Sequence, residues 1–467
     1  MELYQYFNQI NDSIYKPNGQ ALTDLLSLSE LIAVTINNHP NNPFVKIFNA
    51  SQTAKNNTKI QQLKKIDQLV RKAHDIDSTV QNKLQQSSLN ESQYQAYCEI
   101  VSHRLRTITL IFDQNYSEAF NEFSKSVESF IRVFESWSIP VMYKYCYDIR
   151  MLAKLATING SATVDASGKK NDYYEDASRL LSRCFQSATG DRSAVMEQSK
   201  KRASLGIINQ LFQIYFKLNN LKLCKNLIKA IESPGFPSLE TYPPQQLITY
   251  KFFVGRLAAF EGNFKKAQQD LLSAFNKCPP NIPKNKKLIL LYLIPMQLAQ
   301  CKFPKKGLLQ QYNLHQFIGI VDGMKNGNIK QFNQCLATNQ NYFISKGLYL
   351  ILEKLKIIVY RNLFKKIYLI TVSMNANSNA KSRVPIQNFV AALKWAENET
   401  VDVDEAECII SNLIFDGYIK GYISHKVGLI LSPNNPFPKL PLNYIKYLSI
   451  VINCDDIYRS VGCDFEC

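Results

Sequence analysis

A short motif built around asparagine recurs along the chain, each time after one apolar helical stretch and before another. Its four copies are Asn115-Tyr-Ser-Glu-Ala-Phe, Asn220-Leu-Lys-Leu-Cys, Asn263-Phe-Lys-Lys-Ala and Asn328-Ile-Lys-Gln-Phe. Asparagine is favoured at helix N-caps, and a glycine such as Gly262 or Gly327 supplies the left-handed residue at which the previous helix ends. The motif therefore predicts a helix, a tight turn and a second helix, repeated along the chain.

Composition agrees with a mainly α chain. Of 467 residues only 17 are Gly and 18 are Pro, while 46% are hydrophobic, so long helices meet few breakers and can bury a large core. The last three motif copies lie 43 and 65 residues apart, which predicts an irregular α-solenoid of tetratricopeptide-like helical repeats. A generic α-helical bundle is the alternative that this pattern leaves open.

The pattern changes after residue 360. The expected elements are helices over 360–371, 386–396 and 405–415 and two strands over 418–424 and 427–432. Pro385 suits the first turn of the second helix, and Asp402 or Asp404 suits the N-cap of the third. Three helices followed by a hairpin predict a winged-helix domain at the C-terminal side of the repeats.

We therefore expect four regions. They are an N-terminal helix plus an Asn/Gln-rich, partly disordered segment over 1–95, the helical repeat array over 96–340, the winged helix over 341–432 and an atypical C-terminal tail over 433–467. Residues 37–95 show only weak periodicity, over 59–84, so we expect a spacer that holds one exposed helix.

Charge is distributed unevenly. Residues 1–200 carry 22 basic and 21 acidic side chains, residues 201–400 carry 28 and 8, and residues 401–467 carry 5 and 9. We expect the middle segment, with its surplus of +20, to attract a polyanion or an acidic protein in a salt-dependent way. The plainer alternative is that the lysines only keep the chain soluble.

Basic side chains cluster where the repeats meet the predicted winged helix. The candidate nucleic-acid-binding residues are Lys346, Lys354, Lys356, Arg361, Lys365, Lys366, Lys381 and Arg383. Spacings of seven and four place Lys354, Arg361 and Lys365 near one helix face, where a cationic ridge could contact phosphates. The alternative is the solvated face of an amphipathic helix.

The helix in the recognition position, by contrast, begins with Asp402, Asp404, Glu405 and Glu407. These carboxylates suit the dipole of their own helix, but phosphates would repel them in a DNA groove. We therefore expect any binding of RNA or DNA to be indifferent to base sequence and to use the neighbouring basic surface. A sequence-specific transcription factor is disfavoured.

No catalytic or metal-binding motif is visible in the sequence. The five His are scattered, there is no phosphate-binding loop or dinucleotide fingerprint, and the 11 Cys form no C-x-x-C pair. We expect a protein that is not an enzyme and needs no cofactor or metal. No secretory signal and no uninterrupted apolar run long enough to span a bilayer is apparent, so we expect a soluble intracellular protein.

Several longer sequence segments resemble those of one protein family. They lie at residues 209–217, 249–256, 351–356, 360–366, 421–425 and 435–438. Together with helical repeats that run into a winged helix, these segments make the chain similar to PCI-domain subunits and, among them, to the PCI domain-containing protein 2 family, which is signalosome subunit 12-like. The segment before residue 95 and the tail over 439–467 have no counterpart in this resemblance.

The resemblance implies a subunit of the nuclear transcription-and-export complex 2, which couples transcription to messenger-RNA export at the nuclear pore. It implies a large PCI scaffold subunit and a small acidic disordered subunit as partners, RNA or DNA backbone as ligand, no membrane insertion, and an indirect association with the pore. The implied location is the nucleus, with the cytoplasm left open. The alternative is a structural PCI scaffold subunit of a proteasome-lid or signalosome-like assembly that makes no nucleic-acid contact.

Overall fold

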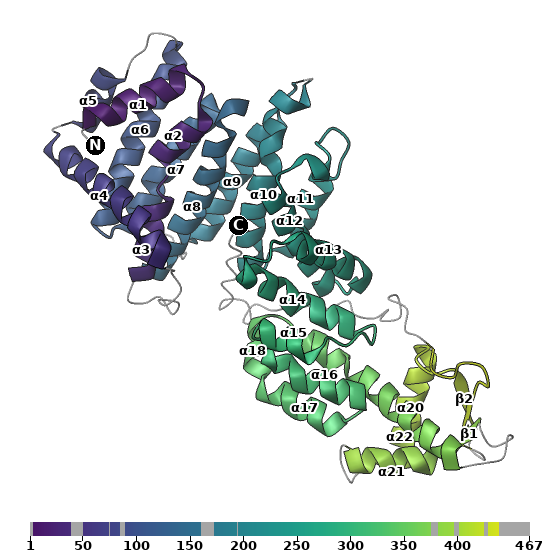
Figure 1. Cartoon of the computed structure of the whole chain (residues 1–467). Coiled ribbons are helices and arrows are strands. Elements are labelled where there is room, and N and C mark those ends of the chain that lie inside the picture. The colour runs from purple at the N-terminus through teal and green to yellow at the C-terminus, as the bar shows by residue number, and fades with distance from the viewer. Residues whose placement is uncertain are drawn as a thin grey trace, which may run out of the picture. The chain divides into compact units, whose positions relative to one another are not determined.

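Figure 1 shows the computed structural model of the whole chain. It describes residues 3–38, 50–73, 75–84, 89–159, 172–193, 195–374, 382–396, 401–424 and 428–438. The chain divides into two compact units, Met1–Gln246 and Leu247–Cys467, and each has its own buried core. This division does not test the four predicted regions, whose boundaries stay predictions.

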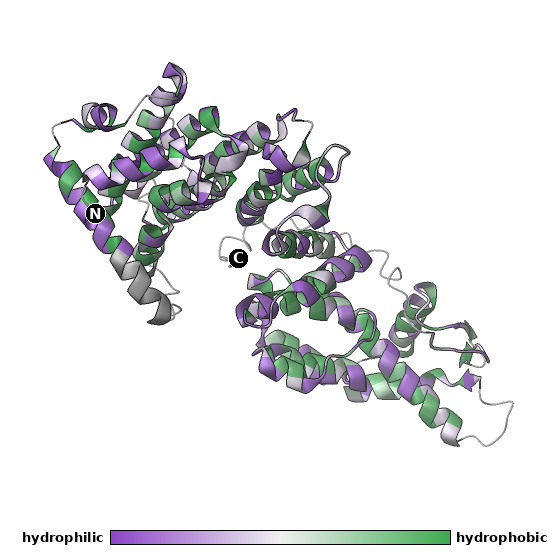
Figure 2. Ribbon diagram, turned by 45° about the horizontal axis from the view of Figure 1, so that its top comes forward, coloured by the Kyte–Doolittle hydropathy of each residue, from purple (hydrophilic) through white to green (hydrophobic). Residues whose placement is uncertain are grey.

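The first unit is helical throughout its described part. Its α-helices are α1 (Leu3–Tyr15), α2 (Gly19–Leu26), α3 (Ser29–Asn38), α4 (Ala50–Lys72), α5 (Ile76–Lys83), α6 (Glu91–Phe112), α7 (Tyr116–Val133), α8 (Ile139–Asn159), α9 (Tyr173–Thr189), α10 (Ser204–Lys217) and α11 (Leu221–Ile231). Its short 3-10 helices are η1 (Ser136–Ser138), η2 (Met196–Gln198), η3 (Lys200–Ala203) and η4 (Leu239–Thr241). Figure 2 shows helices that are hydrophobic on one side and hydrophilic on the other, as expected for packing around a core.

The second unit continues with helices and ends in a small sheet. Its helices are α12 (Pro244–Phe260), which begins at the end of the first unit, α13 (Phe264–Lys277), α14 (Pro283–Leu298), α15 (Lys306–Gln311), η5 (His315–Phe317), α16 (Ile318–Asn326), α17 (Ile329–Thr338), α18 (Gln340–Ser345), α19 (Tyr349–Lys354), α20 (Lys356–Met374), α21 (Ile386–Ala396) and α22 (Val403–Phe415). Its strands are β1 (Arg383–Val384), β2 (Gly421–Ser424) and β3 (Gly428–Leu431).

All four asparagine motifs form the predicted turn between two helices. The residues before the asparagines have a left-handed backbone, with φ of 58° at Gln114, 56° at Asn219, 77° at Gly262 and 63° at Gly327. Asn115, Asn263 and Asn328 each accept a hydrogen bond on Oδ1 from the backbone N–H three residues later. Asn220 occupies the same N-cap position without such a bond. The prediction of repeated helix pairs is confirmed.

The Asn/Gln-rich segment contains two packed helices where the structure describes it. α4 and α5 both lie on α6. Leu63, Ile66 and Val70 of α4 are buried at spacings of three and four, and Val80 of α5 is 1% exposed. A narrow apolar stripe thus holds a segment whose average composition is polar. This corrects the expectation of a spacer with one exposed helix; residues 39–49 and 85–88 lie outside the described residues.

Residues Gly19–Ile36 are long and apolar enough, by length and composition alone, to cross a membrane. The structure divides this stretch into α2 and α3, with an extended residue at Ser27 between them. Half of the stretch is buried, and both helices pack on α8. Leu22 and Ile32 are completely enclosed. This arrangement is typical of core helices in a globular unit.

The C-terminal part of the second unit is the predicted winged helix. α20, α21 and α22 pack together, and α22 contacts a sheet of order β1-β3-β2 in which β3 pairs with both neighbours in antiparallel fashion. The rings of Phe364 and Phe389 meet with centroids 4.9 Å apart, and Leu393, Leu413 and Leu429 are fully buried. The predicted fold class is therefore confirmed. The sequence missed β1, which is only two residues long.

Candidate nucleic-acid interface

The basic candidates do not all lie on one helix. A turn at Leu355 separates α19 from α20. Lys354 is consequently the last residue of α19, whereas Arg361 and Lys365 belong to α20, and Lys346 follows the end of α18. The spacing argument assumed a continuous helix, so the structure corrects the prediction that Lys354, Arg361 and Lys365 share one helical face.

Arg361 is not available to a ligand. The residue is only 6% exposed to solvent. The guanidinium donates hydrogen bonds to the carbonyl oxygens of Tyr418, from Nε at 3.3 Å, and Pro438, from Nη2 at 2.7 Å. It also donates to Oδ1 of Asn362 at 3.1 Å and lies 5.9 Å from the ring centroid of Phe437. Arg361 therefore ties α20 to the segments on either side of the hairpin, and the prediction that it contacts phosphate is corrected.

The other described candidates keep some access to solvent. We call them the winged-helix basic set, whose members are Lys346, Lys354, Lys356, Lys365, Lys366 and Arg383. Lys346 and Lys356 are half-buried, with Nζ of Lys356 5.4 Å from the ring centroid of Tyr360, and the others are exposed. Arg383 lies in β1 rather than in a loop, and Lys381 lies outside the described residues. A role for this set in nucleic-acid binding stays a prediction.

The helix in the recognition position presents carboxylates, as the sequence indicated. Asp402 is the N-cap of α22, and its Oδ1 accepts a hydrogen bond from the backbone N–H of Glu405 at 2.7 Å. Asp402, Asp404 and Glu405 are exposed, and Glu407 is half-buried. Negative charge at this end stabilises the helix through its dipole and opposes insertion between phosphate backbones.

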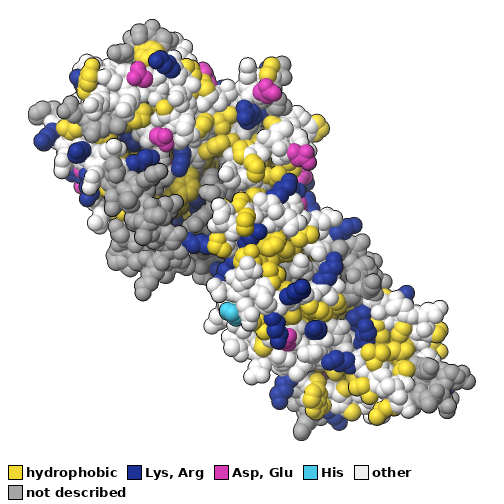
Figure 3. Space-filling model, viewed as in Figure 1, with side chains coloured by type: hydrophobic (Ala, Val, Ile, Leu, Met, Phe, Trp, Pro, Cys, Tyr) yellow, Lys and Arg dark blue, Asp and Glu magenta, His cyan; other side chains and the backbone are white. Residues whose placement is uncertain are grey.

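The winged helix also exposes large apolar side chains, which the sequence analysis missed. They are Leu369, Ile370 and Met374 of α20, Trp395 of α21, Phe415 of α22 and Tyr422 of β2, and Trp395 and Phe415 are 78% and 80% exposed. Figure 3 shows apolar side chains gathered at this end of the second unit. Single exposed apolar residues are common, but several on one small domain indicate a protein-contact surface. A signal was available, because Trp395 falls outside the apolar stripe of α21 that is buried.

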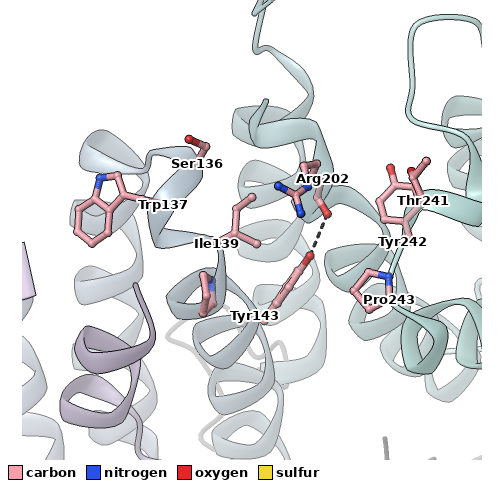
Figure 4. A pocket seen from close by; sticks show the side chains of 9 residues that line it. Ser136, Trp137, Ile139, Tyr143, Arg202, Thr241, Tyr242 and Pro243 are labelled. Atoms are coloured by element: carbon pink, nitrogen blue, oxygen red, sulfur yellow. Dashed lines mark hydrogen bonds between the residues drawn. The ribbon is translucent and has the colours of Figure 1, made fainter. Parts of the chain in front are cut away.

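A pocket in the first unit offers no acid–base pair. It is lined by Ser136, Trp137, Ile139, Pro140, Tyr143, Arg202, Thr241, Tyr242 and Pro243 (Figure 4). Tyr143 donates from Oη to the carbonyl oxygen of Arg202 at 2.9 Å, and Arg202 donates from Nη1 to the carbonyl oxygen of Glu197 at 2.8 Å. Burial raises the pKa of the Tyr143 and Tyr242 phenols, so both stay protonated at neutral pH. Among the described residues, no group of three or more His, Cys, Asp or Glu side chains could hold a metal ion.

Comparison with known proteins identifies the domain and the family. A family model described as "PCI domain" matches residues 328–433. The "PCI domain-containing protein 2 homolog" of Dictyostelium discoideum is 53% identical over 446 residues, which cover 95% of this chain and 100% of that protein. The chain belongs to the PCI domain-containing protein 2 family. The Xenopus laevis "PCI domain-containing protein 2" is 40% identical over 350 residues, 74% of this chain and 85% of that protein, and the Arabidopsis thaliana "Enhanced ethylene response protein 5" is 32% identical over 354 residues, 74% and 83%.

Membership in the PCI domain-containing protein 2 family confirms the resemblance predicted from the sequence segments. The matched domain starts at Asn328, so it includes α17, α18 and α19 as well as the winged helix. The Dictyostelium protein also has a counterpart for most of the Asn/Gln-rich segment. The 5% of the 467 residues that it leaves unmatched is about 23 residues, fewer than the 59 residues of 37–95. This corrects the expectation that the segment has no counterpart in the family.

Proposed function

We propose that this chain is a non-enzymatic subunit of a nuclear complex that couples transcription to messenger-RNA export at the nuclear pore. Its helical repeats bind a large PCI scaffold subunit and a small acidic disordered subunit, and its winged-helix basic set binds RNA or DNA without base preference. The chain acts in the nucleus and reaches the pore through its partners. The observation that carries the proposal is membership in the PCI domain-containing protein 2 family.

The chemistry of the winged helix supports two kinds of contact. Trp395 and Phe415 are rigid apolar groups of the type that anchors protein interfaces. Lys365 and Lys366 are exposed point charges of the type that contacts phosphate. The acidic start of α22 excludes a groove-reading mode, which agrees with binding to the backbone alone. A subunit with both surfaces is suited to hold a nucleic acid next to a protein partner.

The protein partners are tested by purifying a tagged, full-length copy at moderate salt and identifying the co-purifying proteins by mass spectrometry. The proposal expects a second, larger PCI subunit, a small acidic subunit, and messenger-RNA export and pore components. A Trp395→Ala, Phe415→Ala double variant is expected to weaken the contact with the larger PCI subunit, to which the winged helix adds apolar anchors beside the helical repeats, while it keeps its helical content. Recovery of proteasome-lid or signalosome subunits in their place contradicts the proposal.

The nucleic-acid contact is tested by charge reversal in the winged-helix basic set, with Lys354, Lys356, Lys365 and Lys366 changed to Glu. The affinity for a generic RNA oligonucleotide is expected to fall by about tenfold or more, because each lost phosphate contact removes a counterion-release term. Lys64, Lys65 and Lys72 of α4 are also exposed and provide a charge-reversed control. An unchanged affinity in the winged-helix variant removes these lysines from the proposal.

One observation favours a second candidate, a structural PCI scaffold subunit without nucleic-acid contact. The strand order β1-β3-β2 leaves the outer edge of β2 without a strand partner in the described part of the sheet. An exposed strand edge can accept a strand from a neighbouring subunit. If this candidate is right, Ile423→Pro in β2 should abolish assembly with the neighbouring subunit. RNA binding should be absent in both the unaltered chain and the variant. The same purification distinguishes this candidate by the complex that is recovered.

A further inference from the structure

The helices that precede the winged helix carry a large unbalanced positive charge. Residues 271–352 contain ten lysines and one carboxylate, Asp322, and the structure describes all of them. Nζ of Lys306 lies 2.9 Å from Oδ2 of Asp322, so this single carboxylate is already neutralised. Figure 3 shows basic side chains spread over this face of the second unit with few acidic ones among them.

Two turns of this region lie close to one another, and the second of them meets the middle of α20. The first is the turn after α14, which carries Cys301 and the exposed Lys302. Nζ of Lys306, next to Lys305, lies 2.9 Å from Oδ2 of Asp322 in α16, three residues before Lys325, so this turn lies beside the helix that leads to the second turn. Burial raises the pKa of the Cys301 thiol, whereas the charges of Arg361 and Lys365 lower it. Lys305, also exposed, follows three residues after Lys302.

The second turn joins α16 to α17. Asn362 of α20 donates a hydrogen bond from Nδ2 to the carbonyl oxygen of Met324 at 2.8 Å. A Cβ atom at Gly327, whose φ is 63°, would come within 2.5 Å of the Leu363 nitrogen, so only glycine permits this approach. Lys325, next to Met324, is exposed, and the exposed Lys366 lies one helical turn after Asn362.

We propose that Lys302, Lys305, Lys325, Lys365 and Lys366 form one phosphodiester-binding surface, the junction surface, which extends the nucleic-acid contact from the winged helix onto the preceding helices. This inference rests on the proposed function, since it presumes that the chain binds nucleic acid. It adds Lys302, Lys305 and Lys325, from two turns that precede the winged helix, to Lys365 and Lys366 of α20 in the same unit.

The surface suits a phosphate backbone better than an acidic protein. In the two turns that carry Lys302, Lys305 and Lys325, both of them described in full, no large hydrophobic side chain is strongly exposed, and the exposed Leu369 and Ile370 lie further along α20 than Lys365 and Lys366. A protein partner usually requires buried aromatic or aliphatic anchors for affinity, whereas a polyanionic backbone requires only correctly spaced cations. The absence of exposed aromatic rings in these described turns also removes base stacking, so the surface follows the backbone and ignores the bases.

The test uses the full-length chain with Lys302, Lys305 and Lys325 changed to Glu, three positions that belong to the junction surface and not to the winged-helix basic set. The matched control reverses Lys64, Lys65 and Lys72 of α4, with the same change in net charge. Fluorescence anisotropy measures binding of a uridine oligonucleotide about 20 nucleotides long. A duplex DNA of similar length shows whether one or both sources of phosphate are accepted.

The junction variant is expected to bind RNA about tenfold or more weakly than the unaltered chain, and the control to bind within about twofold. Three lost phosphate contacts should also reduce the slope of log affinity against log salt by about 2, because each contact on a single strand contributes about 0.7. Gln at the same three positions removes the charge without adding repulsion and should show the same direction. Hydrogen exchange of α20 verifies that each variant is folded.

Three results would overturn the junction surface, and they are distinguishable. Unchanged RNA binding in the Glu and Gln variants, with binding lost on reversal of Lys354 and Lys356, removes the junction surface and leaves the proposed function standing. An unaltered chain that binds neither RNA nor DNA at low salt contradicts the nucleic-acid part of the proposed function as well. A polyglutamate peptide that binds as tightly as RNA, and equally depends on the three lysines, assigns the surface to an acidic protein.

Discussion

The two units share the chemistry of their helix turns but differ in how much of their charge is paired: the second unit has pairs such as Lys251 with Asp270, yet it also holds a long stretch of surplus lysines. In the first unit, cations pair with carboxylates on neighbouring helices, as Arg183 of α9 does with Glu128 of α7 and Arg106 of α6 with Asp77 of α5. In the second unit, residues 271–352 set ten lysines against one aspartate. Buried charge is also present in both units, at Asp148 in the first and Arg361 in the second.

This difference indicates what role the charged groups have in each unit. Pairing between helices uses charge to fix one internal arrangement, and such pairs contribute little affinity for anything outside. Lysines without nearby carboxylates repel one another and gain only when a polyanion arrives. The first unit is therefore built as a scaffold, and the second unit combines a scaffold, held by groups such as Arg361, with a surface for an external ligand.

The largest expected effect comes from removing the buried arginine of the second unit. Arg361→Ala should lower the free energy of unfolding of this unit by about 4 kcal/mol, because two main-chain carbonyl oxygens each lose a charge-assisted hydrogen bond. Native-state hydrogen exchange in α20 and β2 measures the loss. Lys365→Ala, four residues further along the same helix, is exposed and should change stability by less than about 0.5 kcal/mol. Equal effects of the two changes on stability would contradict the assignment of Arg361 to the buried structure and of Lys365 to an exposed ligand surface.

The sequence predicted most of the winged helix because its signals are local. The stripe of α21, the cap at Asp402 and the alternation of β2 and β3 each depend on residues within a few positions of one another. Arg361 was misassigned because its partners, Tyr418 and Pro438, lie 57 and 77 residues away in sequence. A periodic pattern can place an arginine on a helix, but whether its guanidinium meets solvent depends on such long-range contacts.

The same limit explains the Asn/Gln-rich segment and the exposed apolar groups. Three buried residues of α4 are enough to hold it on α6, and a composition average hides them. The sequence analysis did not single out Trp395 or Phe415, although Trp395 falls outside the apolar stripe of α21. The approach of the turn that carries Lys325 to Lys366 of α20 also depends on tertiary packing and was not visible in the spacing.

A second prediction concerns the buried carboxylate of the first unit. Asp148 of α8 accepts hydrogen bonds from the N–H of Leu28 at 2.8 Å and from Oγ of Ser29 at 2.7 Å, and so caps α3 from another helix. Burial raises its pKa to about 6 from a normal value of 3.8, against the lowering effect of these hydrogen bonds. Between pH 4 and 6 the folded state therefore binds more protons at this site than the unfolded state, so this site lowers stability as pH rises.

The measurable consequence is a difference between the unaltered chain and Asp148→Asn. Over the window from pH 4 to 6, the variant should gain up to about 3 kcal/mol relative to the unaltered chain, since two pKa units correspond to about 2.7 kcal/mol. Comparing the two proteins cancels the titration of all other groups. Hydrogen exchange of α3 amides reports the effect locally. Parallel pH profiles for the two proteins would show that Asp148 keeps an ordinary pKa.

A third prediction concerns the asparagine turn, a motif that occurs in both units. Asn263→Ala should destabilise the local helix pair by about 1 kcal/mol, because the Oδ1 atom that accepts from the Lys266 N–H is removed. Asn220→Ala is the matched control, since Asn220 occupies the same position without a side-chain cap bond, and should cost only a few tenths of a kcal/mol. Hydrogen exchange of the first turns of α13 and α11 compares them. If Asn220→Ala costs as much as Asn263→Ala, the cap bond is not the source of stability.

The smallest expected effect tests the charge comparison directly. Arg183→Glu breaks the pair with Glu128 and should cost about 0.5 to 1 kcal/mol at low salt, a modest value because both side chains are about half exposed. Lys305→Glu relieves repulsion among the lysines of 271–352 and should leave stability unchanged or raise it by a few tenths of a kcal/mol. Both effects should shrink as salt screens the charges, which unfolding at two ionic strengths measures. Destabilisation by both changes would mean that the lysines of 271–352 take part in internal ion pairs. They would then not be available to bind a polyanion.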